Sequence, residues 1–253
     1  MAKLSVYIVA YNEETKIQAA LESVAWASEI VVADSGSTDR TVELTERFGA
    51  RVVQIPFEGF GNLRNRTVEA CSHEWIFSLD ADERCTEQVR DEIREIIADP
   101  DALDAYFVPR RNYFLGRWIR HSGWYPDYRQ PQLFRKGTLR YREDLVHEGF
   151  IAGGRIGYLN HAIWQFPFQD LSEVVSKMQR YSSLGAEKLA GQGVKSGMGK
   201  AFVHALGAFI RIYIIKGGFL DGWAGFVIAL GNFEGTFYRY AKLTVAQKMW
   251  NVP

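Results

Sequence analysis

The sequence has few cysteines and no excess of charge of either sign. Cys71 and Cys85 are the two cysteines among 253 residues, and they form no CxxC pair. Two such residues make no disulfide framework, so we expect reduced thiols in a cytoplasmic protein. Thirty basic and thirty acidic residues give a net charge of zero. No overall positive field attracts nucleic acid, and we expect no nucleic-acid partner.

Several other signals are missing. The first apolar run stops at Asn12, which is too early for a signal peptide, and we interpret it as a strand. No phosphate-binding P-loop, Ser-His-Asp arrangement or zinc-ligand spacing is evident. Apolar residues, in contrast, make up 47% of the chain. That content is enough for the core of one α/β domain with an appendage, and it excludes a disordered protein.

Strand and helix patterns alternate through the first hundred residues. Apolar β-branched runs typical of buried strands cover residues 4–11, 29–37, 50–57 and 74–82. Helical spacing of apolar residues separates and follows them, over residues 13–27, 39–49, 61–71 and 86–100. This alternation predicts an α/β fold with a mostly parallel central sheet that helices cover on both faces.

Polar clusters follow three of the predicted strands. Ligands of parallel sheets bind beyond the carboxyl ends of the strands, so clusters at these ends converge on one edge. The clusters are Asn12 with Glu13, the DSGS segment that starts at Asp34, and the pair Asp80 and Asp82. Residues of an extended chain point alternately to opposite sides, so both aspartates are expected on one side of the chain. Adjacent carboxylates persist where a cation or a basic partner compensates them, and Mg²⁺ or Mn²⁺ prefers such oxygen ligands.

The pattern changes after the fourth strand and helix. Residues 100–166 are aromatic, basic and rich in turns, which predicts short antiparallel strands. Residues 167–253 are expected to form a helical extension. We therefore expect a domain over residues 1–166, divided into 1–99 and 100–166, followed by the extension.

Two apolar runs in the extension, residues 202–215 and 219–233, are interrupted by His204, Arg211 and Asp221. Neither provides about 20 uninterrupted apolar residues, so we expect helices that lie in a membrane interface. The runs are accompanied by basic residues suited to anionic lipid headgroups: Lys200, Arg211, Lys216, Arg239, Lys242 and Lys248. The alternative is packing of these helices on the first domain or on a second subunit of a homo-oligomer.

The ordered motifs VYIVAYNEE, VVADSGSTDRT, GNLRNRTVEA and WIFSLDADE resemble the nucleotide-binding half of family 2 glycosyltransferases with the GT-A fold. The whole chain, including PQLFRKG and VHEGF, resembles the bacterial lipopolysaccharide core β-glycosyltransferases of that family. The resemblance implies an inverting enzyme that moves a hexose, glucose, from a UDP-linked donor to a glycan or glycolipid acceptor. It points to the lipopolysaccharide inner core as acceptor, and to a location on the cytoplasmic face of the inner membrane.

The resemblance also assigns residues to the donor site. It implies that Asn12, Glu13 and Asp34 bind a uracil-like base and its ribose, although the first two also suit a helix start. Ser35 belongs to a segment placed in the donor pocket, although its residues are also ordinary turn residues. Of Arg64 and Arg66 in the third helix, we expect Arg64 to border the site.

The family pattern implies that Asp80 lies near the sugar and ribose, while Asp82 ligates the metal. Transfer further needs a base for the acceptor hydroxyl, and a carboxylate suits this role. Glu148 of VHEGF matches the family's catalytic position, where Asp is commoner; Asp144 is the second choice and Glu143 the third. His161 follows a late strand, where related enzymes often carry a histidine that binds metal or phosphate, and His147 is a candidate for a supporting role.

Two other enzyme classes fit poorly. A nucleotidyltransferase would show a glycine-rich loop with Arg and Lys near its N-terminus, and a phosphatase would carry its paired aspartates on the first strand. Neither feature occurs. The non-enzymatic alternative is a membrane-peripheral protein that binds a sugar nucleotide without turnover. An assay of donor hydrolysis separates it from an enzyme.

Overall fold

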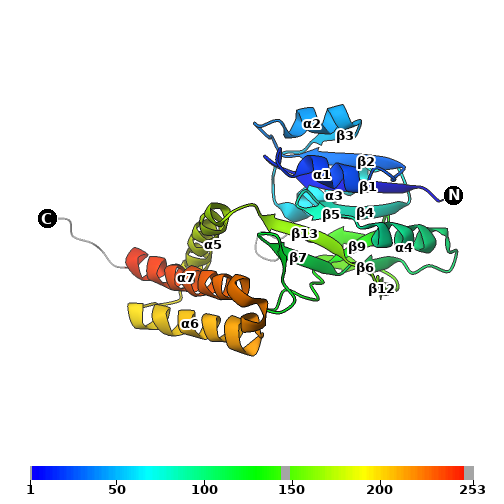
Figure 1. The fold of residues 1–253 in the computed structure, drawn as a ribbon. Helices are drawn as coiled ribbons and strands as arrows, with labels where there is room; N and C mark the ends of the chain where they lie inside the picture. The colour runs from blue at the N-terminus through cyan, green and yellow to red at the C-terminus, as the bar shows by residue number, and fades with distance from the viewer. Residues whose placement is uncertain (1, 144–148, 248–253) are drawn as a thin grey trace. The chain divides into compact units, whose positions relative to one another are not determined.

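The computed structural model describes residues 2–143 and 149–247, and the chain forms two compact units (Figure 1). Unit 1 comprises residues 1–111 and 127–165, and unit 2 comprises residues 112–126 and 166–253. The sequence led us to expect a division between residues 166 and 167. In the structure, residues 112–126 group with the helices that follow residue 166.

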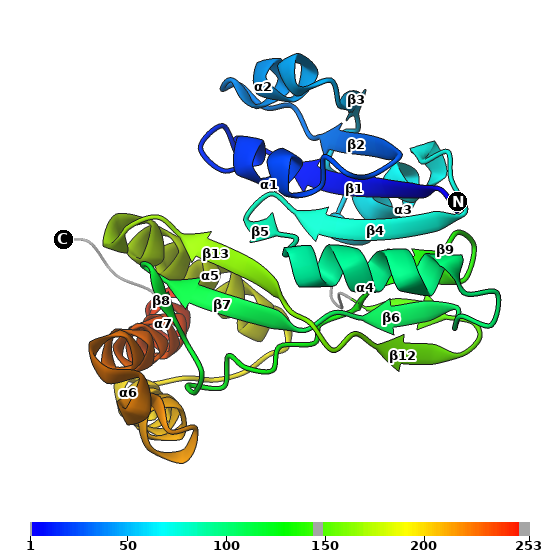
Figure 2. The same cartoon turned by 45° about the vertical axis from the view of Figure 1, so that its right-hand side comes forward.

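Unit 1 contains a seven-stranded sheet with the order β12-β6-β9-β4-β1-β2-β3 (Figure 2). Four pairs of neighbours are parallel, and β9 runs antiparallel to both β4 and β6. The mostly parallel sheet predicted from the sequence is therefore confirmed. The strands are β1 (Leu4–Ala10), β2 (Glu29–Asp34), β3 (Arg51–Gln54), β4 (Trp75–Asp80), β6 (Ala105–Phe107), β9 (Pro131–Arg135) and β12 (Ile156–Tyr158).

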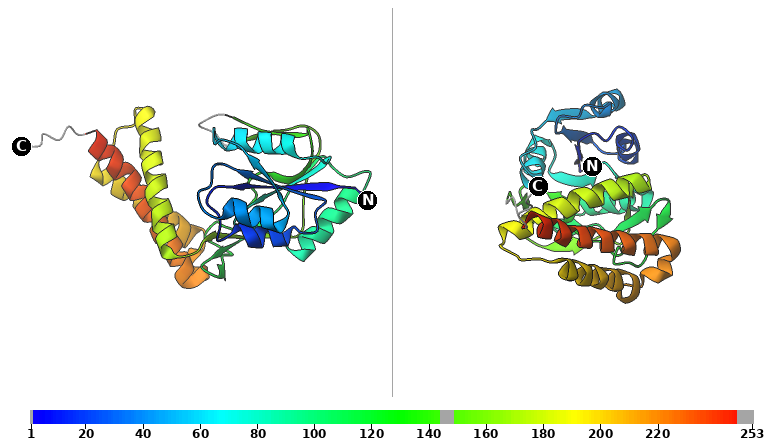
Figure 3. Two further views of the ribbon diagram at one scale, coloured as in Figure 1. Left: turned by 90° about the horizontal axis from the view of Figure 1, so that it is seen from above. Right: turned by 90° about the vertical axis from the view of Figure 1, so that its left-hand side faces the viewer.

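Helices cover both faces of this sheet (Figure 3). Alternation along β1 sends Val6 and Ile8 to one face and Tyr7 to the other. The first face is packed by α1 (Ile17–Ser23), α2 (Thr41–Phe48) and α4 (Glu87–Ala98). The second is packed by α3 (Phe60–Ala70) and by the hairpin of β10 (Leu139–Tyr141) and β11 (Phe150–Ala152).

Residues 154–166, which we interpret from the sequence as one late strand, contribute to two strands in the structure. The first is β12, at the edge of the large sheet. The second is β13 (Ile163–Phe168), which pairs antiparallel with β5 (Glu83–Arg84) in unit 1. The chain continues into unit 2 through β13 and through β7 (Arg110–Phe114), which is followed by β8 (Arg117–Trp118).

Unit 2 is helical, with α5 (Leu171–Gly191), α6 (Met198–Ile210), η1 (Arg211–Ile215), η2 (Gly218–Asp221) and α7 (Gly222–Ala246). Asp221 is 3% exposed and accepts hydrogen bonds from the backbone N–H groups of Arg120 and His121 and from the Ser122 hydroxyl. Asp221 interrupts the apolar run of the sequence, but its carboxylate is buried and anchors the loop at residues 120–122. This helix end is therefore not exposed to water at Asp221.

The helix formed by α6 and η1 differs from the sequence expectation. We treated His204 and Arg211 as interruptions, but Met198–Ile215 is one helix that is long and apolar enough, by length and composition, to cross a membrane. Only 17% of it is buried within the protein. The His204 ring stacks on Tyr240 of α7 at 4.5 Å, so this polar residue contributes to helix packing.

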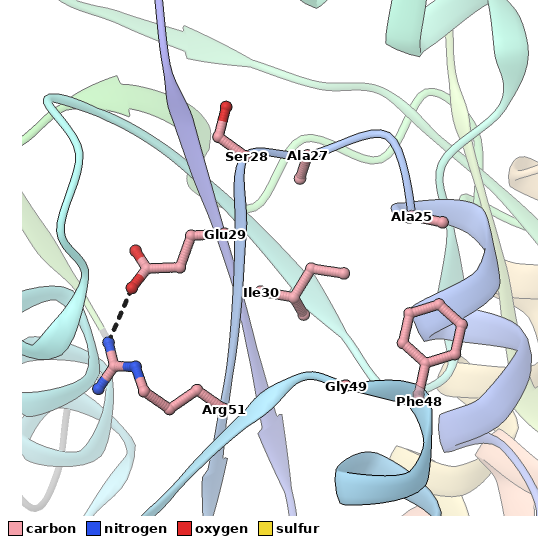
Figure 4. A pocket seen from close by; sticks show the side chains of 8 residues that line it. All are labelled: Ala25, Ala27, Ser28, Glu29, Ile30, Phe48, Gly49 and Arg51. Atoms are coloured by element: carbon pink, nitrogen blue, oxygen red, sulfur yellow. Dashed lines mark hydrogen bonds and ion pairs between the residues drawn. The ribbon is translucent and has the colours of Figure 1, made fainter.

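A pocket at the start of β2 contains the carboxylate of Glu29 (Figure 4). The carboxylate accepts hydrogen bonds from the Ser5 hydroxyl at 2.5 Å, from Ser72 N–H at 2.7 Å and from Arg51 Nη2 at 2.9 Å. Burial raises the pKa of Glu29, but these hydrogen bonds outweigh it and lower the pKa to about 2. This interaction lies at the start of the strand, away from the edge where ligands are expected.

We expect Glu29→Gln to lower the free energy of unfolding at pH 7 by about 1–3 kcal/mol, the usual worth of hydrogen bonds to a charged group. Because the folded-state pKa is depressed, this contribution is complete above the unfolded value and is lost as the pH falls toward about 2. Urea unfolding at pH 7, 5 and 3 measures it. Glu43→Gln, on the exposed surface of α2, is the control and should change stability by less than about 0.5 kcal/mol. A Glu29→Gln effect that does not shrink in acid would contradict this assignment.

Candidate functional site

The loops that follow β1 and β2 are joined by hydrogen bonds. Asn12 N–H donates to Ser37 Oγ at 2.9 Å, and Thr38 N–H donates to Asn12 Oδ1 at 2.8 Å. Glu13 N–H donates to Thr41 Oγ1 at 2.8 Å. Asn12 has a φ of +55°, in the left-handed region that Asn adopts more readily than most residues. The structure thus brings the first two polar clusters of the sequence together.

Asp34 organises the loop that it begins. Its side chain is 1% exposed, and its Oδ2 atom accepts the N–H groups of Gly36 and Ser37, each at 3.0 Å. The Ser37 hydroxyl donates to Oδ1. The hydroxyl oxygen of Ser35 is buried and has no hydrogen-bond partner within the part of the chain that the structure describes. Asp34 thus holds the loop in shape, and the Ser35 hydroxyl is left with unused hydrogen-bonding capacity.

Arg64 and Asp80 form an ion pair at the end of β4. Arg64 Nη2 donates to Asp80 Oδ1 at 2.8 Å, and Nη1 donates to the hydroxyl of Ser78 at 3.1 Å. Burial acts to raise the pKa of Asp80, but the charge of Arg64 outweighs it and holds the pKa below its usual value. Asp80 is therefore ionised and already compensated. Arg66, the other arginine that we considered, is exposed.

Asp82 lies in the turn after β4. We expected an extended chain there, with both aspartates on one side of it. The turn, and not the alternation of a strand, therefore sets the position of Asp82. Gln165 Nε2 lies 3.3 and 3.2 Å from its two carboxylate oxygens. Burial, and next the negative charge of Asp80, raise the pKa of Asp82. Gln165 and the positive charge of Lys16 oppose this rise without cancelling it, and a bound cation would oppose it further.

A buried network that we did not predict fixes this turn. Glu83 is 0% exposed and accepts Arg110 Nε at 2.5 Å, and Arg110 is itself 1% exposed. The second oxygen of Glu83 accepts Asp80 N–H at 2.9 Å and Gln132 Nε2 at 3.0 Å. Burial raises the pKa of Glu83, with Arg110 opposing and the two aspartates adding to the rise. The sequence contained one sign of this network, namely a third acidic residue directly after Asp82.

The remaining residues that we predicted for the site either make other contacts or lie outside the described residues. His161 Nδ1 is 2.9 Å from Glu92 Oε2 on α4, and Glu143 accepts Asn65 Nδ2 at 2.8 Å. Asp144 and Glu148, our candidates for the base, lie outside the described residues, as does His147.

A divalent cation fits Asp82 only as part of a complex with a ligand. Within residues 2–143 and 149–247, no group of three or more His, Cys, Asp or Glu side chains is arranged to hold a metal, so Asp80, Asp82 and His161 do not form one. Asp82 supplies hard oxygen donors, and its raised pKa reflects burial and the nearby charge of Asp80, both of which a cation would offset. Phosphate oxygens and water would have to complete the coordination, as is usual for Mg²⁺.

Comparison with known proteins gives consistent results. Residues 5–166 match the family described as Glycosyl transferase family 2. The lipopolysaccharide core biosynthesis glycosyltransferase LpsC of Rhizobium meliloti (strain 1021) is 30% identical over 251 residues, which cover 95% of this chain and 91% of LpsC. An uncharacterized glycosyltransferase of Rickettsia felis is 28% identical, with 96% and 90% covered.

Solved structures share the fold. S. aureus TarS 1-349, crystallised in complex with UDP-GlcNAc, superposes with a TM-score of 0.52 at 17% identity, covering 91% of this chain and 80% of that one. The GT-A fold expected from the sequence is thus confirmed.

The buried pair of Glu83 and Arg110 generates a prediction about stability. Glu83→Leu or Arg110→Met alone should each lower the free energy of unfolding by about 3–5 kcal/mol, because each leaves the other charge buried without a partner. The double variant should be more stable than either single variant, since no buried charge remains. Urea unfolding of the four proteins measures this coupling. Additive losses would show that the two side chains do not depend on one another.

Proposed function

This chain belongs to glycosyl transferase family 2, and we propose that it transfers glucose from UDP-glucose to a glycan or glycolipid acceptor of the lipopolysaccharide inner core. The observation that carries the proposal is the edge where β1, β2 and β4 end, with an Arg64–Asp80 ion pair and, in the following turn, the carboxylate of Asp82 with its raised pKa. Similarity to LpsC along 95% of the chain supports the choice of acceptor.

The donor occupies the loops that follow β1 and β2. We assign the base and ribose to Asn12, Glu13 and Asp34, of which Asp34 acts chiefly by holding its loop. The buried hydroxyl of Ser35 supplies a hydrogen-bond donor or acceptor. Rigid, preformed contacts of this kind lower the entropic cost of binding, because the loop need not be ordered by the ligand.

The diphosphate lies toward the end of β4. Arg64 contributes positive charge there, and Asp80 orients Arg64 while facing the sugar and ribose. Asp82 would hold Mn²⁺ or Mg²⁺ together with the diphosphate. When bound, the cation supplies positive charge that stabilises the leaving nucleotide.

The last role to assign is that of the general base, which acts on the acceptor hydroxyl. A carboxylate that removes the proton of the acceptor hydroxyl permits direct displacement at the anomeric carbon, and a single displacement inverts its configuration. We assign this role to Glu148, with Asp144 as the second choice. No covalent intermediate is needed, because one carboxylate suffices for direct displacement.

The metal assignment predicts that excess chelator abolishes activity. Asp82→Asn should lower kcat by roughly a thousandfold, since it weakens the electrostatic stabilisation of the leaving group. Asp91→Asn, on the exposed face of α4, is the matched control and should retain activity. Release of UDP, assayed with and without added Mn²⁺ or Mg²⁺, measures both effects. Full activity in excess chelator would refute the metal requirement.

The base assignment predicts that Glu148→Gln keeps donor binding while transfer falls by a factor of roughly 10²–10⁴. An α-linked donor should give a β-linked product, which proton NMR of the anomeric centre reports. If Asp144→Asn loses transfer and Glu148→Gln does not, the roles are exchanged. An α-linked product would rule out the inverting mechanism.

We further propose that unit 2 lies on the cytoplasmic face of the inner membrane. Large apolar side chains of α6, η1, η2 and the start of α7 are 42–72% exposed: Phe202, Val203, Leu206, Ile210, Ile214, Ile215, Phe219, Leu220 and Trp223. Arg211 and Lys216 lie among them and are exposed. Of the other basic residues that we expected near lipid, Lys242 instead binds α5 through Gln179, Ser182 and Ser183, so it is not expected to contact lipid. Lys248 lies outside the described residues.

This surface predicts binding to vesicles that contain anionic lipid. The double substitution Arg211→Glu and Lys216→Glu should weaken binding by at least about tenfold, at roughly 1 kcal/mol for each basic residue near the surface. Arg47→Glu, on α2 of unit 1, is the control and should bind normally. Vesicle flotation at low and high salt measures the effect. Retention at high salt would indicate a spanning helix and contradict the peripheral arrangement.

A further inference from the structure

Four aromatic side chains of unit 1 form one cluster, which we call the aromatic platform: Phe107, Tyr128, Phe150 and Tyr158. The rings of Phe107 and Tyr158 stack with centroids 5.2 Å apart and planes at 16°. Tyr128 lies edge-on to both, at 6.3 and 5.2 Å. Phe150 lies edge-on to Phe107 at 5.9 Å. These are favourable geometries for aromatic pairs, so the platform is an ordered surface.

The platform has little part in the hydrophobic core. Tyr158 is 61% exposed and Tyr128 is 41% exposed. Phe107, Tyr128 and Tyr158 are absent from the buried clusters that fill the two faces of the sheet, and only Phe150 packs against one of them. Burial of apolar surface therefore does not account for these rings, and a grouped exposed patch of this kind indicates binding.

The strand directions place the platform at the edge that carries the donor site. Because β9 is antiparallel to both β4 and β6, these two strands run in the same direction, and β12 is parallel to β6. Phe107 ends β6 and Tyr158 ends β12, just as Asp80 ends β4. In the sheet order, β4 separates β6 and β12 from β1 and β2. The platform and the donor loops thus lie on opposite sides of the carboxylates.

The chain neighbour of one platform residue is linked to the carboxylates by hydrogen bonds. Tyr128 is followed in the chain by Arg129, whose Nη2 lies 3.4 Å from Gln165 Oε1. Gln165 in turn contacts both oxygens of Asp82. The segment that carries Tyr128 is therefore tied to the turn that carries Asp82.

We propose that the aromatic platform binds a pyranose ring of the acceptor glycan, and this rests on the proposed function. One face of a pyranose presents C–H groups while its hydroxyls point outward. Stacking on an aromatic ring buries the C–H face and leaves the hydroxyls hydrated, and the tyrosine hydroxyls add hydrogen-bonding capacity. A donor on one side of β4 and an acceptor ring on the other bring the two sugars together at the carboxylates.

The test uses Tyr158→Ala and Tyr128→Ala in the full chain, with an oligosaccharide prepared by deacylating lipopolysaccharide core as acceptor. Each substitution should raise the KM for this acceptor about tenfold, while the KM for the donor and donor hydrolysis without acceptor stay unchanged. Tyr158→Phe should retain most acceptor affinity because it keeps the ring. Ile151→Ala, 60% exposed on β11 outside the platform, is the control and should match the wild type.

Direct binding separates this inference from the proposed function. Saturation-transfer NMR of the same oligosaccharide with wild type and Tyr158→Ala needs no turnover. Donor hydrolysis by the wild type tests the proposed function alone. Unchanged acceptor KM and unchanged NMR transfer in Tyr158→Ala would overturn the platform's role. The role would also be overturned if Tyr158→Ala left acceptor binding intact but changed another property. A changed sedimentation coefficient would indicate that the platform binds a second subunit, and changed vesicle binding would indicate that it binds lipid.

Discussion

The ion pair between Glu83 and Arg110 is the interaction on which the site depends. Both side chains are almost completely buried, so each requires the other to offset the loss of water. Glu83 also accepts the N–H group of Asp80, which fixes the turn that carries Asp82. The position of the aspartates relative to Arg64 therefore depends on a contact that touches no ligand. A site that must hold carboxylates close together in spite of their repulsion needs such rigid support.

Charge is divided unevenly along this edge. Arg64 forms an ion pair with Asp80, whereas Asp82 is hydrogen-bonded by Gln165 and keeps a raised pKa in spite of the positive charge of Lys16. This asymmetry suits the different roles that we propose for the two carboxylates: Asp80 orients Arg64, and Asp82 holds a cation together with the donor. The two sides of β4 also differ in the residues that they carry. The polar loops follow β1 and β2 on one side, and the aromatic platform lies at the ends of β6 and β12 on the other.

Local patterns predicted the first half of the fold well. Apolar periodicity located β1, β2, β3 and β4, and Gly49 ends α2 with a φ of +89°, as expected of a helix stop. The convergence of Asn12, Asp34 and Asp80 followed from strand direction alone. The ion pair of Glu83 and Arg110 could not be predicted, because 27 residues separate the two and burial of a charged pair leaves no periodic signal in the sequence. The split of residues 154–166 into β12 and β13 was missed for the same reason: their partners lie on distant strands.

The grouping of residues 112–126 with the C-terminal helices constrains how the chain acquires its structure. The loop at residues 120–122 has its acceptor in Asp221, about a hundred residues later. During synthesis, unit 1 can gather most of its strands once residue 165 has emerged, but unit 2 stays incomplete until Asp221 has been made. The exposed apolar helix between these points is then produced before its partner α7, so the newly made chain passes through a stage in which α6 has no intramolecular cover, when an adjacent membrane surface or a chaperone would protect it from aggregation.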